Sequence, residues 1–404
     1  MLRCASFVLL LAGSLGAQGA LIVVDAAGGP GSHATQIADA VALAADGDTI
    51  LVRSGEYIPF VVDGRALVIT AAPGASVTIT SSAQSEWAFE VRHVAPQQVV
   101  VIAGLSNTWT HGALVHDCGG QVWLQDCHLL GQVLDGGPAL RVSVSDAVML
   151  VRSSLAGSFF WTEPDGPGFG SGLHAVASRV FVHDSTLTGG RSAEPPSLFP
   201  QSGPGAAIEG GLLVLEGSSV TGGEGGGQFD PGLGLCLPIK TGDGLQLASA
   251  ATAISLDTSI QDGGCFPGAD CCTHGDDVEV GPGSSYQPLP GPSANFTLAS
   301  PLPDGQPATL DVSGAPGDLP LLLVATSLGP VNWFAKYSGA LVAGSPFLLL
   351  LAPIPAGGTL AVPFGFPDAL PPGTGSTVFL QGAVFKATGG GLLSDPFTLT
   401  TFEE

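Results

Sequence analysis

A short pattern that occurs five times between residues 122 and 260 constrains this chain more than any other feature. Each copy has apolar residues at alternating positions, a polar turn and then another apolar residue. A further short apolar segment precedes each copy. The copies begin at residues 122, 148, 180, 213 and 254, which gives spacings of 26, 32, 33 and 41 residues. A two-strand unit repeated at such spacings is typical of coils stacked into a β-solenoid.

Alternation within each strand predicts which side chains face the interior of the stack. Residues i and i+2 point to the same side of a strand, and successive coils lie about 4.8 Å apart. The first and third positions of every copy are apolar, so we expect two interior stacks of like residues. The first stack contains Val122, Val148, Val180, Leu213 and Ile254, and the second contains Leu124, Leu150, Val182, Leu215 and Leu256.

Composition excludes several other classes of protein. Gly (60) and Pro (32) are frequent among the 404 residues, and only 11% of the residues are charged. Helical bundles and coiled coils need abundant Glu, Lys and Arg, so those folds are excluded. Eleven Lys and Arg against 34 Asp and Glu give a net charge of −23, with no cationic cluster. Nucleic acid and anionic lipid are therefore poor candidates as partners, because polyanions bind clustered cations.

The N-terminal part of the chain resembles a known family. A helix predicted within residues 33–45 would place Ile37, Val41 and Ala44 on one apolar face, suited to cap the open end of a solenoid. Gly-Asp-Thr-Ile follows at residues 47–50, and Gly-Glu-Tyr at residues 55–57. At these residues the chain resembles right-handed parallel β-helix proteins of the pectin-lyase-like superfamily. The resemblance covers roughly residues 21–280 and implies the fold rather than an activity, since this fold carries lyases, hydrolases, epimerases and non-enzymes.

The whole chain is predicted to be all-β, with four successive segments. They are a signal peptide (1–19), a right-handed parallel β-helix with an N-terminal capping helix (20–280), a Pro/Gly-rich linker (281–300) and a small antiparallel β-sandwich (301–404). Short apolar strands separated by turns predict the sandwich. Residues 378–385 and 393–396 resemble the C-terminal β-domain of exported planctomycete proteins, which implies surface attachment, sorting or a structural role.

The first nineteen residues predict export. Arg3 supplies a positive charge, residues 7–15 form a short apolar run, and Ala17-Gln18-Gly19 offers the small residues of a cleavage site. Residues 341–351 are interrupted by Gly and Pro and are too short to span a membrane. We therefore expect a protein that is secreted or attached to the outer cell surface, with no membrane span after the signal is removed.

Cysteine usage agrees with export. Six cysteines follow the signal segment, and an even number in an exported protein favours disulfides. The candidates are Cys118, Cys127, Cys236, Cys265, Cys271 and Cys272, whose pairing stays open. The cluster at residues 265–277, which includes His274, could instead hold a metal ion, although its spacing differs from that of zinc fingers. His116 and Cys118 are predicted to point inward, as a core histidine and as a disulfide or buried thiol.

The outward side of the repeated strand holds the best candidate site. His183, Glu216 and Asp257 would lie on three consecutive coils, near enough for an acid/base pair or one metal ion. Trp123 and Phe181, in the neighbouring outward row, would form a stacking platform for sugar rings. The alternative is that inserted loops cover this apolar row and that the three polar residues are merely solvated.

Motifs of the common catalytic classes, such as His-Glu-x-x-His, Gly-x-Ser-x-Gly and the phosphate-binding Walker pattern, do not occur in the sequence. We therefore expect an exported, non-catalytic β-helix protein that is structural or glycan-binding. The alternative is a polysaccharide lyase or glycoside hydrolase that acts on the outer face of the helix. No cofactor is expected. Ca²⁺, which lyases of this fold use, has no supporting motif here, and the expected partner is polysaccharide or other cell-surface material.

Overall fold

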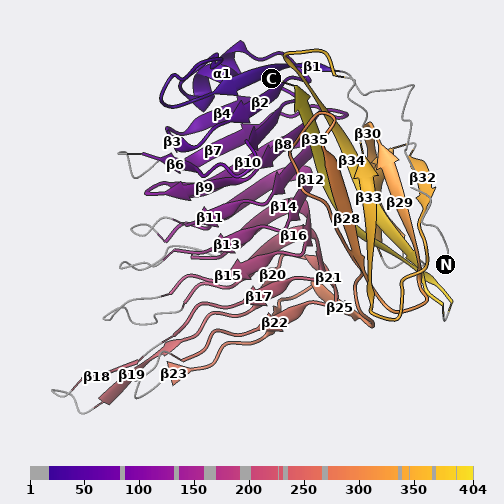
Figure 1. The fold of residues 1–404 in the computed structure, drawn as a ribbon. Helices are drawn as coiled ribbons and strands as arrows, with labels where there is room; N and C mark the ends of the chain where they lie inside the picture. The colour runs from indigo at the N-terminus through magenta and orange to yellow at the C-terminus, as the bar shows by residue number, and fades with distance from the viewer. Residues whose placement is uncertain are drawn as a thin grey trace.

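The computed structural model describes residues 18–81, 87–131, 136–158, 170–191, 202–225, 227–230, 235–265, 272–334, 339–344, 346–365, 370–387 and 389–403. Within these ranges the chain is all-β apart from one α-helix, α1 (Ile37–Leu43). Figure 1 shows a stack of coils with a group of C-terminal strands packed against one side of it. The long parallel sheets in the stack are consistent with a solenoid-like fold.

One face of the coil stack is an eight-stranded parallel sheet, which we call the short-strand face. Its strands are β3 (Gly55–Tyr57), β6 (Val77–Thr80), β9 (Leu105–Thr108), β11 (His128–Leu130), β13 (Ser154–Ala156), β15 (Thr186–Thr188), β17 (Ser219–Thr221) and β22 (Ser259–Gln261). Each coil contributes one of these strands, because the chain returns to the same face once per turn of the stack.

Long strands that bend in the middle form the other two faces. They are β10 (His111–Gln125), β12 (Leu140–Val151), β14 (Leu173–His183) and β16 (Ala206–Glu216). The residue at each bend has a positive φ, from 46° at Ala177 to 72° at Gly210. Because of these bends, one strand can serve two faces of the stack.

The halves before the bends form the polar face, and the halves after the bends form the docked face. The polar face also contains β4 (Phe60–Asp63), β7 (Trp87–Arg92), β20 (Leu245–Ala248) and β24 (Val278–Val280). The docked face also contains β1 (Gly19–Val24), β2 (Thr49–Val52), β5 (Val68–Ala71), β8 (Val99–Ala103), β21 (Thr252–Leu256) and β25 (Ser285–Leu289).

Like residues stack in the interior as the repeat predicts. Val122, Val148 and Val180 are paired in register on consecutive coils, and all are fully buried in one continuous core. The predicted capping helix is confirmed, because Ile37 and Val41 of α1 belong to the same core. Stacked identical side chains fill the interior because every coil presents the same shape to the next.

The predicted register of the fifth copy is wrong by one residue. Leu213 pairs with Ala253, and Glu216 pairs with Leu256, so Ala253 and Ser255 take the interior positions. Leu256 instead points outward into the cluster beneath the C-terminal strands. Alternation favoured the wrong register, because Ile254 and Leu256 are larger and more apolar than Ala253 and Ser255, and a shift of one residue moves every side chain to the other side.

A ladder of small polar side chains closes the turn between the docked face and the short-strand face. The Ser153 hydroxyl accepts a hydrogen bond from the Cys127 N–H at 3.1 Å and donates one to the Val151 carbonyl at 3.0 Å. Ser185 and Ser218 repeat this arrangement on the next two coils. Small hydroxyl residues recur at this turn because each satisfies a backbone N–H of the neighbouring coil.

Glycines form a seam where inserted segments leave and re-enter the stack. Along this seam, the arm of chain that leaves the stack alternates with the arm that returns to it, and backbone hydrogen bonds join each arm to the next. The bonds run from Gly203 N–H to Gly190 O (2.9 Å), from Gly223 N–H to Gly203 O (2.8 Å), from Gly242 N–H to Gly223 O (2.9 Å) and from Gly263 N–H to Gly242 O (2.9 Å). A Cβ at Gly242 or Gly263 would overlap the backbone across the seam. Beyond it, β18 (Gly227–Asp230), β19 (Leu235–Lys240) and β23 (Cys272–Thr273) form a separate small sheet.

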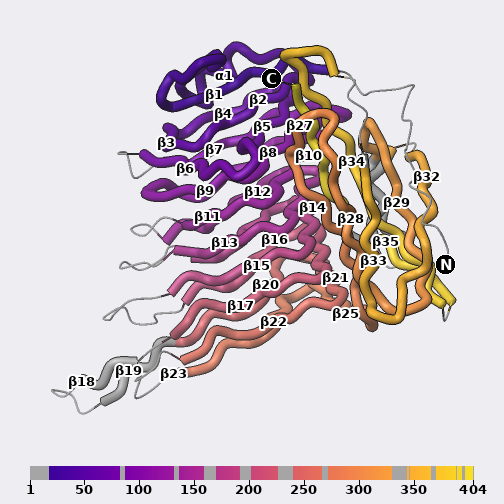
Figure 2. The backbone as a smooth tube through the Cα atoms, viewed as in Figure 1, coloured from indigo at the N-terminus to yellow at the C-terminus, as the bar shows by residue number. Residues whose placement is uncertain are grey.

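The C-terminal strands are mostly antiparallel and lie along the docked face (Figure 2). They are β26 (Asn295–Thr297), β27 (Leu302–Pro303), β28 (Pro307–Ser313), β29 (Leu319–Ala325), β30 (Ser327–Phe334), β31 (Gly339–Gly344), β32 (Phe347–Leu350), β33 (Thr359–Gly365), β34 (Thr374–Phe385) and β35 (Gly391–Glu403). β34 pairs with β1, so this C-terminal domain joins the first strand of the stack. The segment 281–300, expected as a linker, contains β25 on the last coil and β26 in the C-terminal domain.

Two adjacent glycines test the seam. We expect Gly263→Ala to lower the free energy of unfolding by about 2 kcal/mol or more, because the new methyl group has no space. Gly264→Ala, whose Cβ would meet nothing within 4 Å, should change it by less than about 0.5 kcal/mol. Denaturant unfolding of the two variants measures both values, and equal stability of the pair would contradict the seam.

Candidate functional site

The aromatic row predicted as a sugar platform is buried. Trp123 and Phe181 are both 0% exposed and lie in a cluster with Phe379, Phe397 and other residues of the C-terminal domain. The Trp123 and Phe379 ring centroids are 5.5 Å apart. The row is covered as the alternative hypothesis required, but by the C-terminal domain. The predicted stacking platform therefore does not exist in this structure.

Two of the three predicted catalytic candidates do lie together. His183 on β14 and Glu216 on β16 are paired in register, and His183 Nδ1 lies 3.3 Å from Glu216 Oε2. Each residue is only 3% exposed, on the docked face. The pair is an interaction within the covered interface, and a polymeric substrate cannot reach it there.

Asp257 lies apart from this pair, because the register of the fifth copy is shifted. It occupies the turn after β21 with a φ of 48°, and its Oδ2 accepts hydrogen bonds from the N–H and hydroxyl of Ser293, both at 2.9 Å. Asp184 occupies the same turn position two coils earlier and accepts a hydrogen bond from Asn295 at 2.7 Å. These aspartates anchor the segment that leads into the C-terminal domain.

Sequence reasoning missed the polar residues that bind the C-terminal domain. The Gln125 side chain accepts hydrogen bonds from the Thr398 N–H (2.8 Å) and hydroxyl (3.0 Å), as a neighbouring strand would. The Gln121 amide donates to the Gly329 carbonyl at 2.7 Å. The signal was present as two glutamines on the outward side of one strand, but their partners lie more than 200 residues away in the chain.

A cleft of about 380 Å³ lies where the docked face meets β30. Its polar lining includes Gln98, Gln121, Asp146 and Arg179. The Arg179 guanidinium lies over the Phe181 ring, 5.8 Å from its centroid. The cleft thus combines amide, carboxylate and guanidinium groups, a set that can hydrogen-bond the hydroxyl or carboxylate groups of a small polar ligand.

The polar face carries a cluster of charged groups around His116. This histidine pairs with Ser143 and points outward, so the prediction of a core histidine is wrong. Its ring nitrogens lie 3.0 Å from Glu90 Oε1 and 2.8 Å from Asp117 Oδ2. Burial acts against the charged form, but the hydrogen bonds and charges of Glu90 and Asp117 outweigh it and raise the pKa of His116.

His174, also on the polar face, shows the opposite behaviour. Its Nε2 lies 2.8 Å from Glu209 Oε1, but the ring itself is buried. Burial lowers the pKa of His174, and the interaction with Glu209 offsets only part of that effect. The pKa of His116 is therefore raised and that of His174 is lowered, so acid changes the contributions of the two histidines to stability in opposite directions.

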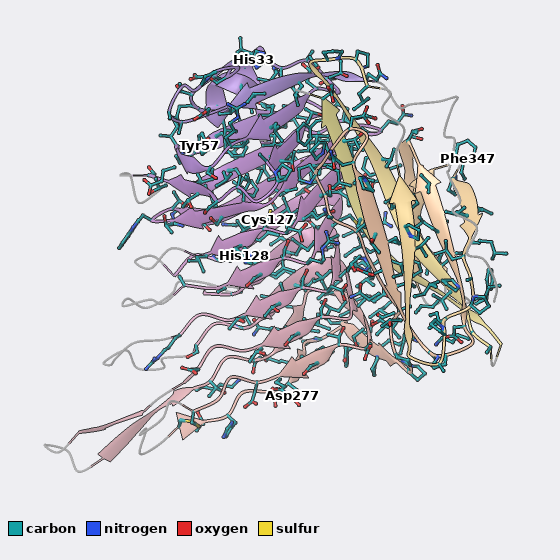
Figure 3. All side chains as sticks on the ribbon, in the orientation of Figure 1. His33, Tyr57, Cys127, His128, Asp277 and Phe347 are labelled. Carbon is teal, nitrogen blue, oxygen red and sulfur yellow. A yellow bond between two sulfur atoms is a disulfide. The ribbon has the colours of Figure 1, made fainter. Side chains whose placement is uncertain are left out.

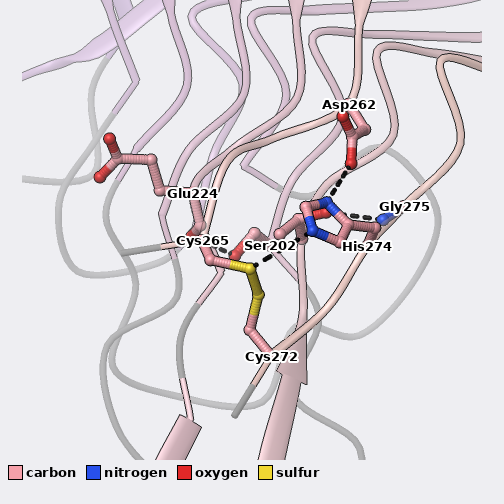
Figure 4. Close-up of a disulfide and its surroundings, with 8 residues drawn as sticks. Ser202, Glu224, Asp262, Cys265, Cys272, His274 and Gly275 are labelled. Carbon is pink, nitrogen blue, oxygen red and sulfur yellow. Dashed lines mark hydrogen bonds and ion pairs between the residues drawn. A yellow bond between two sulfur atoms is a disulfide. The ribbon is translucent and has the colours of Figure 1, made fainter. Parts of the chain in front are cut away.

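The cysteines divide into a disulfide and buried thiols. Cys265 and Cys272 form a disulfide, as predicted for this cluster (Figure 4). Cys118 and Cys127 are buried free thiols, so the buried-thiol alternative is confirmed for Cys118 and the prediction of Cys127 as a disulfide partner is wrong. Figure 3 shows Cys127 inside the stack, where burial raises its pKa to about 12. Cys271 and the Cys236 side chain lie outside the described residues.

One group in the described ranges has the spacing of a metal site. The ligand atoms of Cys265, Cys272 and His274 lie within 4.8 Å of one another. Both sulfurs are joined in the disulfide, and a disulfide sulfur lacks the negative charge of a metal-binding thiolate. The arrangement therefore supports the disulfide over the metal alternative.

No family model matches the chain, and no curated protein matches it. In the part of the chain that the structure describes, no helix is long and apolar enough to cross a membrane. The inserted loops at 159–169 and 192–201 lie outside the described residues.

Two tryptophans provide a matched test of the covered row. We expect Trp123→Ala to lower the free energy of unfolding by about 3–5 kcal/mol, because it leaves a cavity between the stack and the C-terminal domain. Trp109→Ala, at a side chain that is 72% exposed, should change it by less than about 0.5 kcal/mol. Denaturant titration measures both, and a harmless Trp123→Ala would show that the row is not packed.

The two histidines predict opposite effects of pH on stability. The pKa of His116 is higher in the folded state than in the unfolded state, where it is about 6.5. His116 therefore stabilises the fold fully below a pH of about 6.5, and this contribution is lost as the pH rises through the folded-state pKa. The lowered pKa of His174 makes the protein lose stability as pH falls below about 6.5. His116→Gln should therefore increase, and His174→Gln decrease, the fall in melting temperature between pH 8.5 and pH 5.5. Identical pH profiles for wild type and both variants would contradict this assignment.

Proposed function

We propose that this chain is an exported, non-catalytic, right-handed parallel β-helix protein that is structural or glycan-binding, at the cell surface or outside the cell. The stacked coils, the capping helix and the residues resembling the pectin-lyase-like superfamily support the fold. The right hand follows from the general preference of parallel crossover connections. The signal pattern in residues 1–19 supports export.

The observation that carries the non-catalytic part is the burial of the docked face. An enzyme acting on that face needs an acid or base within reach of its substrate. His183 and Glu216, the acid/base pair of the enzyme hypothesis, are covered by the C-terminal domain, and Asp257 holds Ser293 instead. The C-terminal domain thus occupies the surface on which a substrate would have to bind.

The cleft at the edge of the docked face supports a binding role. Asp146 offers a carboxylate suited to sugar hydroxyls, and Arg179 offers a planar fork suited to a single carboxylate. The Gln98 and Gln121 amides already bond to Asp46 and Gly329 and shape the wall of the cleft. The net charge of −23 repels long polyanions, which favours neutral or weakly acidic glycans. We assign glycan binding to this cleft.

The alternative function is a polysaccharide lyase or glycoside hydrolase. The 3.3 Å contact between His183 and Glu216 favours it, since acid/base pairs need such proximity. It would require the C-terminal domain to leave the docked face before substrate could bind.

Incubation with a panel of neutral and acidic polysaccharides separates the two functions. We expect binding without cleavage, with affinity falling about tenfold in Arg179→Ala, a loss of about 1.4 kcal/mol. Arg141→Ala, which removes an exposed arginine from the polar face, is the matched control and should bind normally. Affinity electrophoresis measures binding, and reducing-end and unsaturated-product assays measure cleavage. Cleavage that disappears in Glu216→Gln would establish the enzyme instead.

A further inference from the structure

The Cys265–Cys272 disulfide lies at the base of the last inserted segment (Figure 4). Cys265 forms a parallel bridge with Gly225 of the coil before, and Cys272 pairs with Ile239 of β19. The Cys265 residue is exposed and Cys272 is half-buried, so a small thiol can reach the bond. The disulfide joins the outgoing and returning arms of one insert.

A histidine supported by a carboxylate makes a close contact with the Cys265 sulfur. His274 Nε2 is 3.7 Å from Cys265 Sγ, and His274 Nδ1 is 2.7 Å from Asp262 Oδ2. Asp262 is itself fixed, because its N–H donates to Asp277 Oδ1 at 2.9 Å. The imidazole thus lies between the carboxylate and the Cys265 sulfur.

The position of His274 makes the two sulfurs chemically unequal. In thiol–disulfide exchange, the sulfur that leaves as the more stable thiolate leaves faster. A histidine beside a cysteine stabilises its thiolate, either as an imidazolium or by donating a hydrogen bond. Asp262 accepts a hydrogen bond from His274 Nδ1 and so orients the ring with Nε2 toward the Cys265 sulfur.

We infer that Cys265–Cys272 is a thiol-reactive disulfide whose Cys265 sulfur leaves toward His274. A thiolate from a low-molecular-weight thiol attacks Cys272 Sγ and forms a new disulfide with it. The Cys265–Cys272 bond breaks, and its electron pair stays on Cys265 Sγ as a thiolate next to His274 Nε2. A second thiol then releases Cys272, so that two thiols are oxidised to one disulfide and the protein disulfide is reduced to two thiols. The reaction unlinks the two arms of the insert, and it is independent of glycan binding.

The other described cysteines provide an internal control. Cys118 and Cys127 are buried thiols whose pKa values are raised by burial, so neither should react in the folded protein. Reaction of the native chain should therefore be confined to the insert cysteines. A Cys236→Ser/Cys271→Ser background isolates Cys265 and Cys272 from the other two.

The test is exposure of the full native chain to 2-mercaptoethanol, followed by trapping with iodoacetamide and site-resolved mass spectrometry. We expect early alkylation at Cys265, the mercaptoethanol adduct at Cys272, and a rate on the order of tenfold lower in His274→Gln. His128→Gln, which removes an exposed histidine from the short-strand face, should react like wild type. An unchanged rate in His274→Gln, or alkylation divided equally between the two cysteines, would overturn the inference. Equal melting temperatures of the variants would exclude unfolding as the cause.

Discussion

Burial of the outward apolar row against the C-terminal domain is the interaction on which the rest of this structure depends. The interior of a solenoid accounts for one side of each strand only, and the other side usually carries polar residues. Here Trp123, Met149, Phe181 and Val214 form a second apolar surface, and all are buried with residues of the C-terminal domain. Each such side chain stabilises the folded state by about 1.5–3 kcal/mol relative to exposure, so this burial holds the C-terminal domain against the stack.

The polar contacts around this row fix the position of the C-terminal domain on the docked face. Gln125 bonds to Thr398 as a strand edge would, while Asp184 and Asp257 hold the segment at residues 293–295 that leads into the C-terminal domain. Pairing of β34 with β1 adds a backbone connection at the first coil. Such directional bonds at both ends allow only one placement of the C-terminal domain, which apolar burial alone would not specify. The functional consequence is that binding must occur at the edges of the covered face or on the other faces.

Much of the coil stack could be predicted from the sequence, because its determinants are local. Alternating residues identified the interior stacks of four copies, and helical spacing identified the cap through Ile37 and Val41. The prediction for the fifth copy was wrong because Ile254 and Leu256 are more apolar than Ala253 and Ser255, which take the interior positions. His116 failed because the bend at Asp117, with a φ of 53°, changes the side to which neighbouring residues point. The cover over Trp123 could not be predicted, since it depends on contacts between residues that are far apart in the chain.

The same distinction applies to the candidate site. Proximity of His183 and Glu216 followed from the repeat, but their burial did not, and the cleft beside Gln121 required knowledge of where β30 lies. Hydroxyl-radical footprinting of the intact chain directly tests whether the outward apolar row is buried, because it reports solvent access residue by residue. We expect Met149, Trp123 and Phe181 to stay unmodified while the exposed Trp109 is oxidised rapidly. Oxidation of Met149 and Trp123 at rates similar to that of Trp109 would contradict it.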